Sequence, residues 1–205
     1  METPVLTPES NQASDLRELR VTEVRGPNVV QIRRAVLRFG GETTWNELMS
    51  KVSVPCRLRF ERPMSLYEWV EECHFTELSQ AYLHLSGRDD IGRAGASAAQ
   101  EEFTTLHRWM LKMMTPGFLI SSLPRFFAHY HRGGRVVVDD VGPGHARISL
   151  WADGFFPEWF SQGMTAWTQR AMELTGAQGV FVVYEAPPAS GPEYCRHVYR
   201  LAWRA

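Results

Sequence analysis

The most constraining feature of this sequence is a hairpin pattern in its second half. Residues 135–141 form a run rich in valine, and residues 146–151 alternate apolar with polar side chains. Gly142-Pro143-Gly144, a combination typical of turns, lies between them. The pattern recurs in residues 179–184 and 194–203, which flank a proline-rich loop. We therefore expect two pairs of antiparallel strands.

Most of the remaining chain has helical spacing. Apolar side chains recur three and four positions apart in residues 29–37, 66–85, 103–113, 118–130 and 157–174. These intervals place the apolar side chains on one face of a helix, which can then cover a sheet.

Residues that begin or end helices set the expected boundaries in the first half. Ser65 and Glu68 have the spacing of a capping box, which predicts a helix that begins directly after Ser65. Gly87 suits the end of that helix. Pro55 and Pro63 indicate an extended link between them.

Helices that are separate from antiparallel hairpins define the α+β class. We expect N-terminal helices packed on a small antiparallel sheet of about four strands. Residues 1–18 are rich in polar residues and proline, which predicts a disordered lead. Residues 19–205 are then a single domain, of a length that can bury a sizeable core.

Charge and cysteine content exclude several classes of protein. The net charge is −1, whereas broad binding of nucleic acid or of anionic membranes needs a basic excess. No apolar run reaches the roughly 20 residues of a membrane helix. Cys56, Cys73 and Cys195 show no disulfide framework. We therefore expect a cytoplasmic protein that binds neither nucleic acid directly nor a membrane.

Four segments, taken in order, carry a resemblance to known proteins. They are Thr115-Pro116-Gly117-Phe118, the hairpin of residues 134–148, Leu174-Thr175-Gly176-Ala177 and the last strand of residues 194–203. Over residues 63–203 this order resembles a large paralogous family of myxobacterial proteins. More distantly it resembles the vinyl-reductase domain, whose fold is similar to that of haem-nitric-oxide-binding domains and of subunits of the transport-particle tethering complex.

The resemblance implies a pocket between helices and sheet, which relatives use for small apolar ligands. The candidate ligand-binding residues are the aromatic side chains of the long helices, namely Trp109, Phe118, Phe126, Phe127 and Tyr130.

The resemblance also implies a homodimer, because relatives of this fold commonly pair. Phe155 and Phe156 lie at a strand-to-helix corner, where both rings are hard to bury, and are candidates for the interface. The N-terminal helix around Val29, Ile32 and Val36 is the other candidate surface.

The sequence lacks a complete ligand set for haem or zinc. Haem domains of this fold use a histidine together with a Tyr-x-Ser-x-Arg motif, and residues 82–88 hold these residue types at the wrong spacing. Cys195 and His197, two positions apart on a strand, could reach one ion, but structural zinc needs four ligands. We therefore expect no cofactor and no metal, with Cys195 and His197 as the alternative metal site.

These observations predict a module without catalytic residues that senses a small apolar molecule or binds another protein. One alternative is an enzyme for a small apolar or aromatic substrate, with Tyr82, His84 or His107 as its proton-transfer group. Another is a scaffold protein whose pocket stays empty. The sequence does not separate these three hypotheses.

Overall fold

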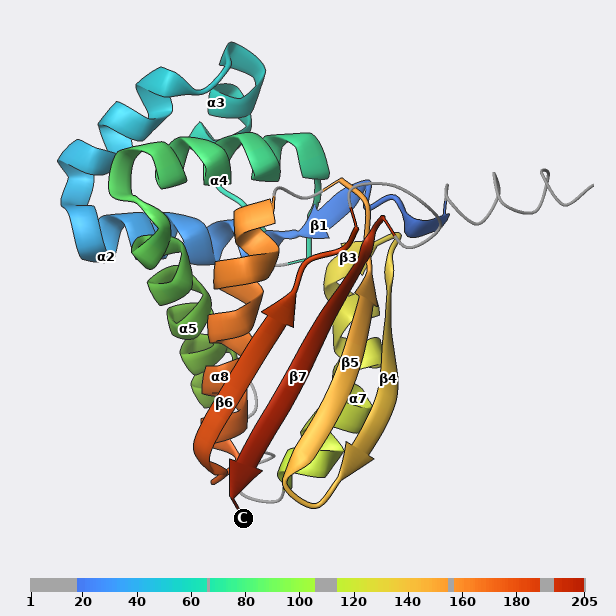
Figure 1. The fold of residues 1–205 in the computed structure, drawn as a ribbon. Coiled ribbons are helices and arrows are strands. Elements are labelled where there is room, and N and C mark those ends of the chain that lie inside the picture. Colours follow the sequence, from blue (N-terminus) through green and yellow to red (C-terminus); the bar gives the residue numbers. More distant parts are fainter. Residues whose placement is uncertain (1–17, 66, 106–113, 155–156, 189–193, 205) are drawn as a thin grey trace, which may run out of the picture.

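The computed structural model describes residues 18–65, 67–105, 114–154, 157–188 and 194–204. A four-stranded antiparallel sheet in the order β4-β5-β7-β6 fills the lower part of Figure 1. Its strands are β4 (Arg135–Gly142), β5 (His145–Trp151), β6 (Gln178–Glu185) and β7 (Arg196–Arg204). Both expected hairpins pair antiparallel, which confirms the α+β class predicted from the sequence.

Helices cover one face of this sheet. Helix α7 (Pro116–Tyr130) lies behind β4 and β5, and α8 (Thr165–Leu174) lies behind β6 and β7 (Figure 1). The π-helical turn η1 (Trp159–Met164) leads into α8, and α5 (Arg88–Thr105) packs against both. Because side chains alternate along a strand, Ala146, Ile148 and Leu150 of β5 all face these helices and are buried.

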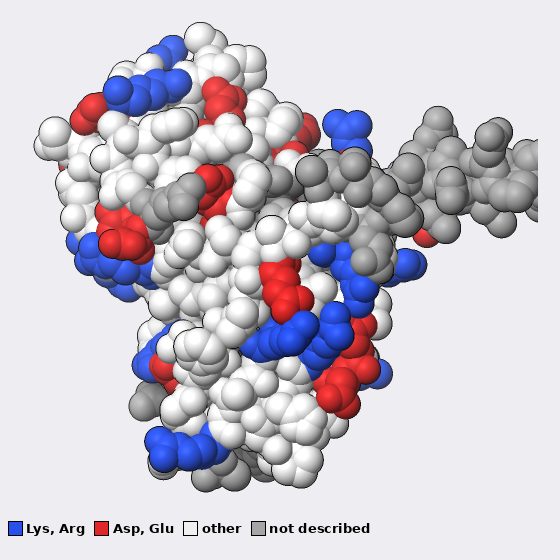
Figure 2. Space-filling model, in the orientation of Figure 1, with Lys and Arg blue, Asp and Glu red and all other residues white. Residues whose placement is uncertain are grey.

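Most side chains on the opposite face of the sheet are exposed, although Ser149 and Val198 are buried, and this face carries paired charges. A guanidinium nitrogen of Arg200 lies 2.9 Å from a carboxylate oxygen of Glu185, and one of Arg196 lies 3.7 Å from a carboxylate oxygen of Asp139. Figure 2 shows acidic and basic side chains side by side over this face. Exposed ion pairs contribute little stability, so the sheet is held mainly by its buried face.

The N-terminal helices form the other end of the molecule. They are α2 (Gly26–Lys51), α3 (Val54–Glu61) and α4 (Glu72–Ser86). Helix α2 bends at Gly41, whose φ of +73° is the left-handed conformation that glycine adopts without strain. Val29, Ile32 and Val36 of α2 are buried, so they form part of the core and not the second dimer surface that the sequence left open.

The expectation of an extended link between Pro55 and Pro63 was wrong, because α3 occupies most of it. Ser53 caps this helix: its Oγ accepts a hydrogen bond from the Cys56 N–H over 3.4 Å. Pro55 lies in the first turn, where its missing N–H costs nothing. Pro63 lies two residues beyond the end of α3, so the two prolines lie near the ends of a helix and not of an extended link.

The helix expected directly after Ser65 begins only at Glu72. The capping-box contact is present, since the Ser65 N–H donates to the Glu68 carboxylate over 3.4 Å, but a strand follows it. The end of the helix is as expected: the Gly87 N–H donates to the Leu83 carbonyl over 2.8 Å. The capping-box residues thus determine the local turn, but they do not determine whether a helix or a strand follows it.

A second, three-stranded antiparallel sheet was not predicted. Its order is β2-β1-β3, with β1 (Glu23–Arg25), β2 (Trp69–Glu71) and β3 (His131–Arg132). Residues 19–24 alternate apolar with polar side chains, which predicts a short strand, and β1 overlaps the end of this segment. Strands as short as β2 and β3 show no such pattern. This sheet joins the N-terminal helices to the end of α7, and it brings His131 beside the start of α2.

Within the described ranges, no helix combines the length and the apolar composition that a membrane crossing requires. The lead expected over residues 1–18 falls almost entirely outside the described residues.

Candidate functional site

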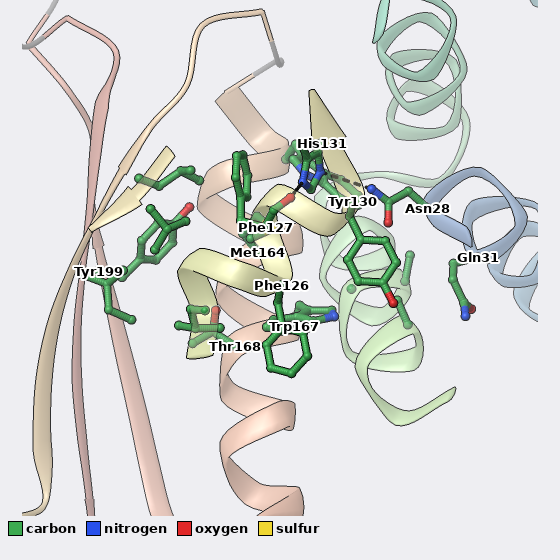
Figure 3. Close-up of a pocket in the computed structure, with 18 of the residues that line it drawn as sticks. Asn28, Gln31, Phe126, Phe127, Tyr130, His131, Met164, Trp167, Thr168 and Tyr199 are labelled. Atoms are coloured by element: carbon green, nitrogen blue, oxygen red, sulfur yellow. Dashed lines mark hydrogen bonds between the residues drawn. The ribbon is translucent and has the colours of Figure 1, made fainter. Parts of the chain in front are cut away.

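A cavity of about 90 Å³ lies between the helices and the inner face of the four-stranded sheet (Figure 3). Side chains of α2, α5, α7 and α8 form one side of it, and those of β4, β5 and β7 form the other. This is the position at which the resemblance to known proteins implied a pocket.

Aromatic rings form much of the cavity wall. Phe126 and Phe127 come from α7 and Trp167 from α8. Phe103 of α5 packs against two of these rings: its centroid lies 6.2 Å from that of Phe126 and 5.8 Å from that of Trp167. Packed rings of this kind give the wall a fixed shape.

The structure brings together three of the predicted ligand-binding residues, Phe126, Phe127 and Tyr130. They recur three and four positions apart, so they share one face of α7. Trp109 lies outside the described residues, as do the predicted dimer residues Phe155 and Phe156.

Phe118 does not line the cavity, so its predicted place was wrong. Its side chain is 57% exposed. Phe118 precedes Phe126 by eight residues, which rotates it by about 80° around the helix axis. Its backbone has a structural role instead, because the Phe118 N–H donates to the Oγ1 of Thr115, the N-cap of α7, over 3.2 Å.

Four half-buried polar side chains form a rim at one side of the cavity, and we call Asn28, Gln31, Tyr130 and His131 the polar rim (Figure 3). His131 is its best-defined member. The Nδ1–H of His131 donates to the Phe127 carbonyl over 3.1 Å, and Nε2 accepts from the Asn28 side-chain amide over 3.2 Å. The imidazole also stacks on the Phe127 ring at 4.2 Å between centroids.

This arrangement requires a neutral imidazole. Burial lowers the pKa of His131 to about 4, so the ring is uncharged at pH 7 and one ring nitrogen is free of a proton to accept from Asn28. No described residue that lines the cavity is a lysine, arginine, aspartate or glutamate. The described lining is therefore apolar with neutral hydrogen-bonding groups at one side, which suits an uncharged molecule.

At the alternative metal site, Cys195 with His197, the imidazole already has a hydrogen-bond partner and a stacking partner. The Tyr184 hydroxyl donates to Nδ1 of His197 over 2.8 Å, and the imidazole stacks on Phe160 at 3.6 Å between centroids. Burial lowers the pKa of His197 to about 4 as well. In the described part of the chain, Cys195 and His197 do not belong to any group of three close metal-ligating side chains.

The proton-transfer residues of the enzyme hypothesis are not brought to the cavity. Tyr82 is buried in α4, and burial raises its pKa to about 12. His84 is exposed near the end of the same helix, and His107 lies outside the described residues.

The polar rim is the part of the site that the sequence did not reveal. Asn28 and Gln31 read as solvent-facing positions of a helix, and His131 as one of several polar residues near a helix end. The signal that unites them is the pairing of β1 with β3, which places the end of α7 against the start of α2. No periodic pattern in the sequence predicts that β1 pairs with β3.

No protein-family model matches this sequence, and no curated protein is significantly similar to it. Solved structures are similar in fold. An Fe(II) unliganded H-NOX protein from K. algicida has a TM-score of 0.64 and 8% identity, covering 88% of this chain and 97% of that one. An H-NOX protein from S. oneidensis in the Fe(II)NO state has a TM-score of 0.65 and 10% identity, covering 88% of this chain and 99% of that one.

An oxygen-binding H-NOX domain related to soluble guanylate cyclases has a TM-score of 0.66 and 8% identity, covering 88% of this chain and 95% of that one. Identities this low show the fold alone. The chain thus has the fold of H-NOX proteins, the haem-nitric-oxide-binding class among those that the sequence resembles.

Proposed function

We propose that this protein is a binding module that senses a small, uncharged and mainly apolar molecule in the cavity between its helices and sheet. The observation that carries the proposal is the lining itself: aromatic side chains from α7 and α8 around the space, and the neutral polar rim at one side. A site of this composition gains affinity from apolar burial and orientation from a few hydrogen bonds.

The size of the cavity narrows the class of ligand. Its volume of about 90 Å³ is well below the roughly 300–1,000 Å³ of pockets for drug-sized ligands. It is closer to the roughly 150 Å³ of an engineered apolar cavity that binds benzene. A single aromatic ring, or an aliphatic molecule of similar size, with one hydroxyl, carbonyl or N–H group toward the polar rim, is the occupant that this supports.

Haem is the group that the fold relatives suggest, and the described residues of this chain do not fit it. The described lining offers one imidazole to a haem iron, that of His131, and both of its ring nitrogens already have hydrogen-bond partners. No arginine or lysine stands among the described lining residues to pair with the propionates, and the space is far too small for a porphyrin. The proposal is therefore that this chain uses the fold for a smaller ligand.

Phenol, which has one aromatic ring and one hydroxyl group, is a suitable probe. At concentrations well above its Kd, phenol should raise the unfolding temperature of the wild type. Ala98→Leu, which places extra methyl groups in the cavity, should remove most of that shift. Ala128→Leu adds the same groups on the exposed side of α7 and is the matched control.

An equal shift in both variants would contradict the proposal, because phenol would then bind elsewhere. In parallel, the purified protein should be colourless, and added haem should give no stoichiometric Soret band. A stoichiometric band would contradict the exclusion of haem while leaving the fold unaffected.

The enzyme hypothesis has less support, because the pKa values of His131 and Tyr199 at the cavity are shifted away from neutral pH. A general acid or base works best with a pKa near the working pH. Burial instead lowers the pKa of His131 to about 4 and raises that of Tyr199 well above its usual value.

The wider setting of the module is also a proposal. We infer that it works in a reducing compartment such as the cytoplasm, which its three free cysteines suit. We also infer that it pairs into a homodimer, because relatives of the fold that the sequence resembles commonly pair.

A further inference from the structure

A cluster of metal-ligating side chains lies away from the cavity, where α3 packs on α4. Cys56 comes from the first turn of α3, and His74 and Glu77 come from the first half of α4. Their possible ligand atoms, one from each residue, all lie within 4.8 Å of one another. Cys56 is fully buried, whereas His74 and Glu77 are half-buried, so the cluster has a closed side and an open one.

Hydrogen bonds hold two of these three side chains in place. The Glu77 carboxylate accepts from the Ser53 N–H, and also from the Ser53 hydroxyl over 2.8 Å. The same Ser53 Oγ accepts from the Cys56 N–H. One residue thus orients both the carboxylate and the helix turn that carries the thiol, which is the kind of support that surrounds the ligands of metal sites in proteins.

The spacing on α4 brings the other two donors to one face. His74 and Glu77 are three residues apart, so they are neighbours along the helix. The capping of α3 by Ser53 then sets Cys56 against that face from the other helix. The Cys56 thiol lies 3.6 Å from the His74 carbonyl oxygen, and this contact fixes the approach of the two helices.

We propose that Cys56, His74 and Glu77 form a Zn²⁺ site. A thiolate, an imidazole and a carboxylate together suit zinc, whereas Mg²⁺ and Ca²⁺ prefer oxygen donors alone. Three protein ligands leave the fourth tetrahedral position, on the open side of the cluster, for water. On binding, the Cys56 thiol releases its proton to the solvent and the sulfur binds the ion.

The test uses the full chain, reduced and stripped of metal, and titrates it with Zn²⁺ against a chromophoric chelator and with Co²⁺ as a spectroscopic substitute. We expect one Zn²⁺ per chain, and a Co²⁺ complex with a thiolate-to-cobalt charge-transfer band. Cys56→Ser should abolish that band. His74→Gln should weaken Zn²⁺ binding by about 100-fold or more, since even residues behind the ligands contribute about 10- to 100-fold.

Two matched controls separate this site from adventitious binding. Cys73→Ser removes the exposed thiol next to His74, and His84→Gln removes an exposed imidazole of the same helix. Both should bind Zn²⁺ and Co²⁺ as the wild type does.

The proposal is overturned if the wild type binds no stoichiometric Zn²⁺, if the charge-transfer band survives in Cys56→Ser, or if the band disappears in Cys73→Ser. Where Cys56→Ser does not fold, His74→Gln decides, because His74 is only half-buried. Unchanged affinity in His74→Gln would overturn the site.

Discussion

His131 and His197 are two histidines that the fold keeps neutral by different contacts. His131 links the Phe127 carbonyl to Asn28, and so joins α7 to α2 at the polar rim. His197 lies on β7, where Tyr184 of the neighbouring strand donates to it. In both cases burial lowers the pKa to about 4, so protonation has to break a contact or draw water inside.

These two residues predict that the protein loses stability in mild acid. Their pKa is about 4 in the folded chain, against about 6.5 for histidine in an unfolded chain. The unfolded state therefore binds more protons below about pH 6.5, so the stability is full above that pH and falls as the pH drops toward 4. Between pH 7 and pH 5 each histidine should lower the free energy of unfolding by roughly 1–2 kcal/mol.

Urea unfolding at a series of pH values measures this loss. His197→Gln should show a shallower decrease than the wild type, whereas the exposed His84→Gln should show the full decrease. An unchanged decrease in His197→Gln would contradict the account of that residue.

At the residue scale, the sequence predicts side chains that share a helix face better than those that meet through tertiary pairing. Helical spacing is enough to group Phe126, Phe127 and Tyr130. Phe118 fits the same composition, but its rotation on the helix turns it to solvent. Asn28 and His131 meet only because β1 pairs with β3, a contact that no local pattern encodes.

At the element scale, α5 and the π-helical turn η1 approach each other closely enough to need a glycine. A Cβ on Gly95 would overlap the carbonyl oxygen of Gly163. On the same helix, a Cβ on Gly92 would find its nearest neighbour, the Cβ of Ala166, at 3.9 Å, an ordinary contact. The two glycines therefore differ in what an added methyl group meets.

This difference predicts opposite effects of the same substitution. Gly92→Ala should stabilise the protein by up to about 1 kcal/mol, because alanine favours the helix. Gly95→Ala should destabilise it by about 1–3 kcal/mol, because α5 has to move away from η1. Urea unfolding of both variants checks this, and equal stability of the two would show that the helices are not in close contact here.

The elements that the sequence predicts well are those with a long periodic pattern or a strong turn. The hairpin β4–β5, with its glycine and proline turn, and helix α7, with its Thr115 cap, follow from local residues. Helix α3 and strands β2 and β3 do not, because each is short and depends on a neighbour. The grouping of Phe126, Phe127 and Tyr130 on one face of α7 follows from the periodic pattern, whereas the polar rim depends on the pairing of short strands.

At the scale of the whole molecule, the expectation of a homodimer remains a prediction. A stable interface buries about 1,200 Å² or more in total. Light scattering after size exclusion should report a dimer at micromolar concentration, and replacing Phe155 and Phe156 with serine should weaken it without loss of cooperative unfolding. A monomer over the whole concentration range would contradict the prediction.

The most direct test of the central claim is a crystal structure of the protein exposed to bromobenzene, with the bromine located by its anomalous signal. The account predicts one strong bromine peak inside the cavity, between Ala98 of α5, Phe126 of α7 and Trp167 of α8, and its loss in Ala98→Leu. Bromine only outside the cavity, or density for a porphyrin within it, would contradict the account.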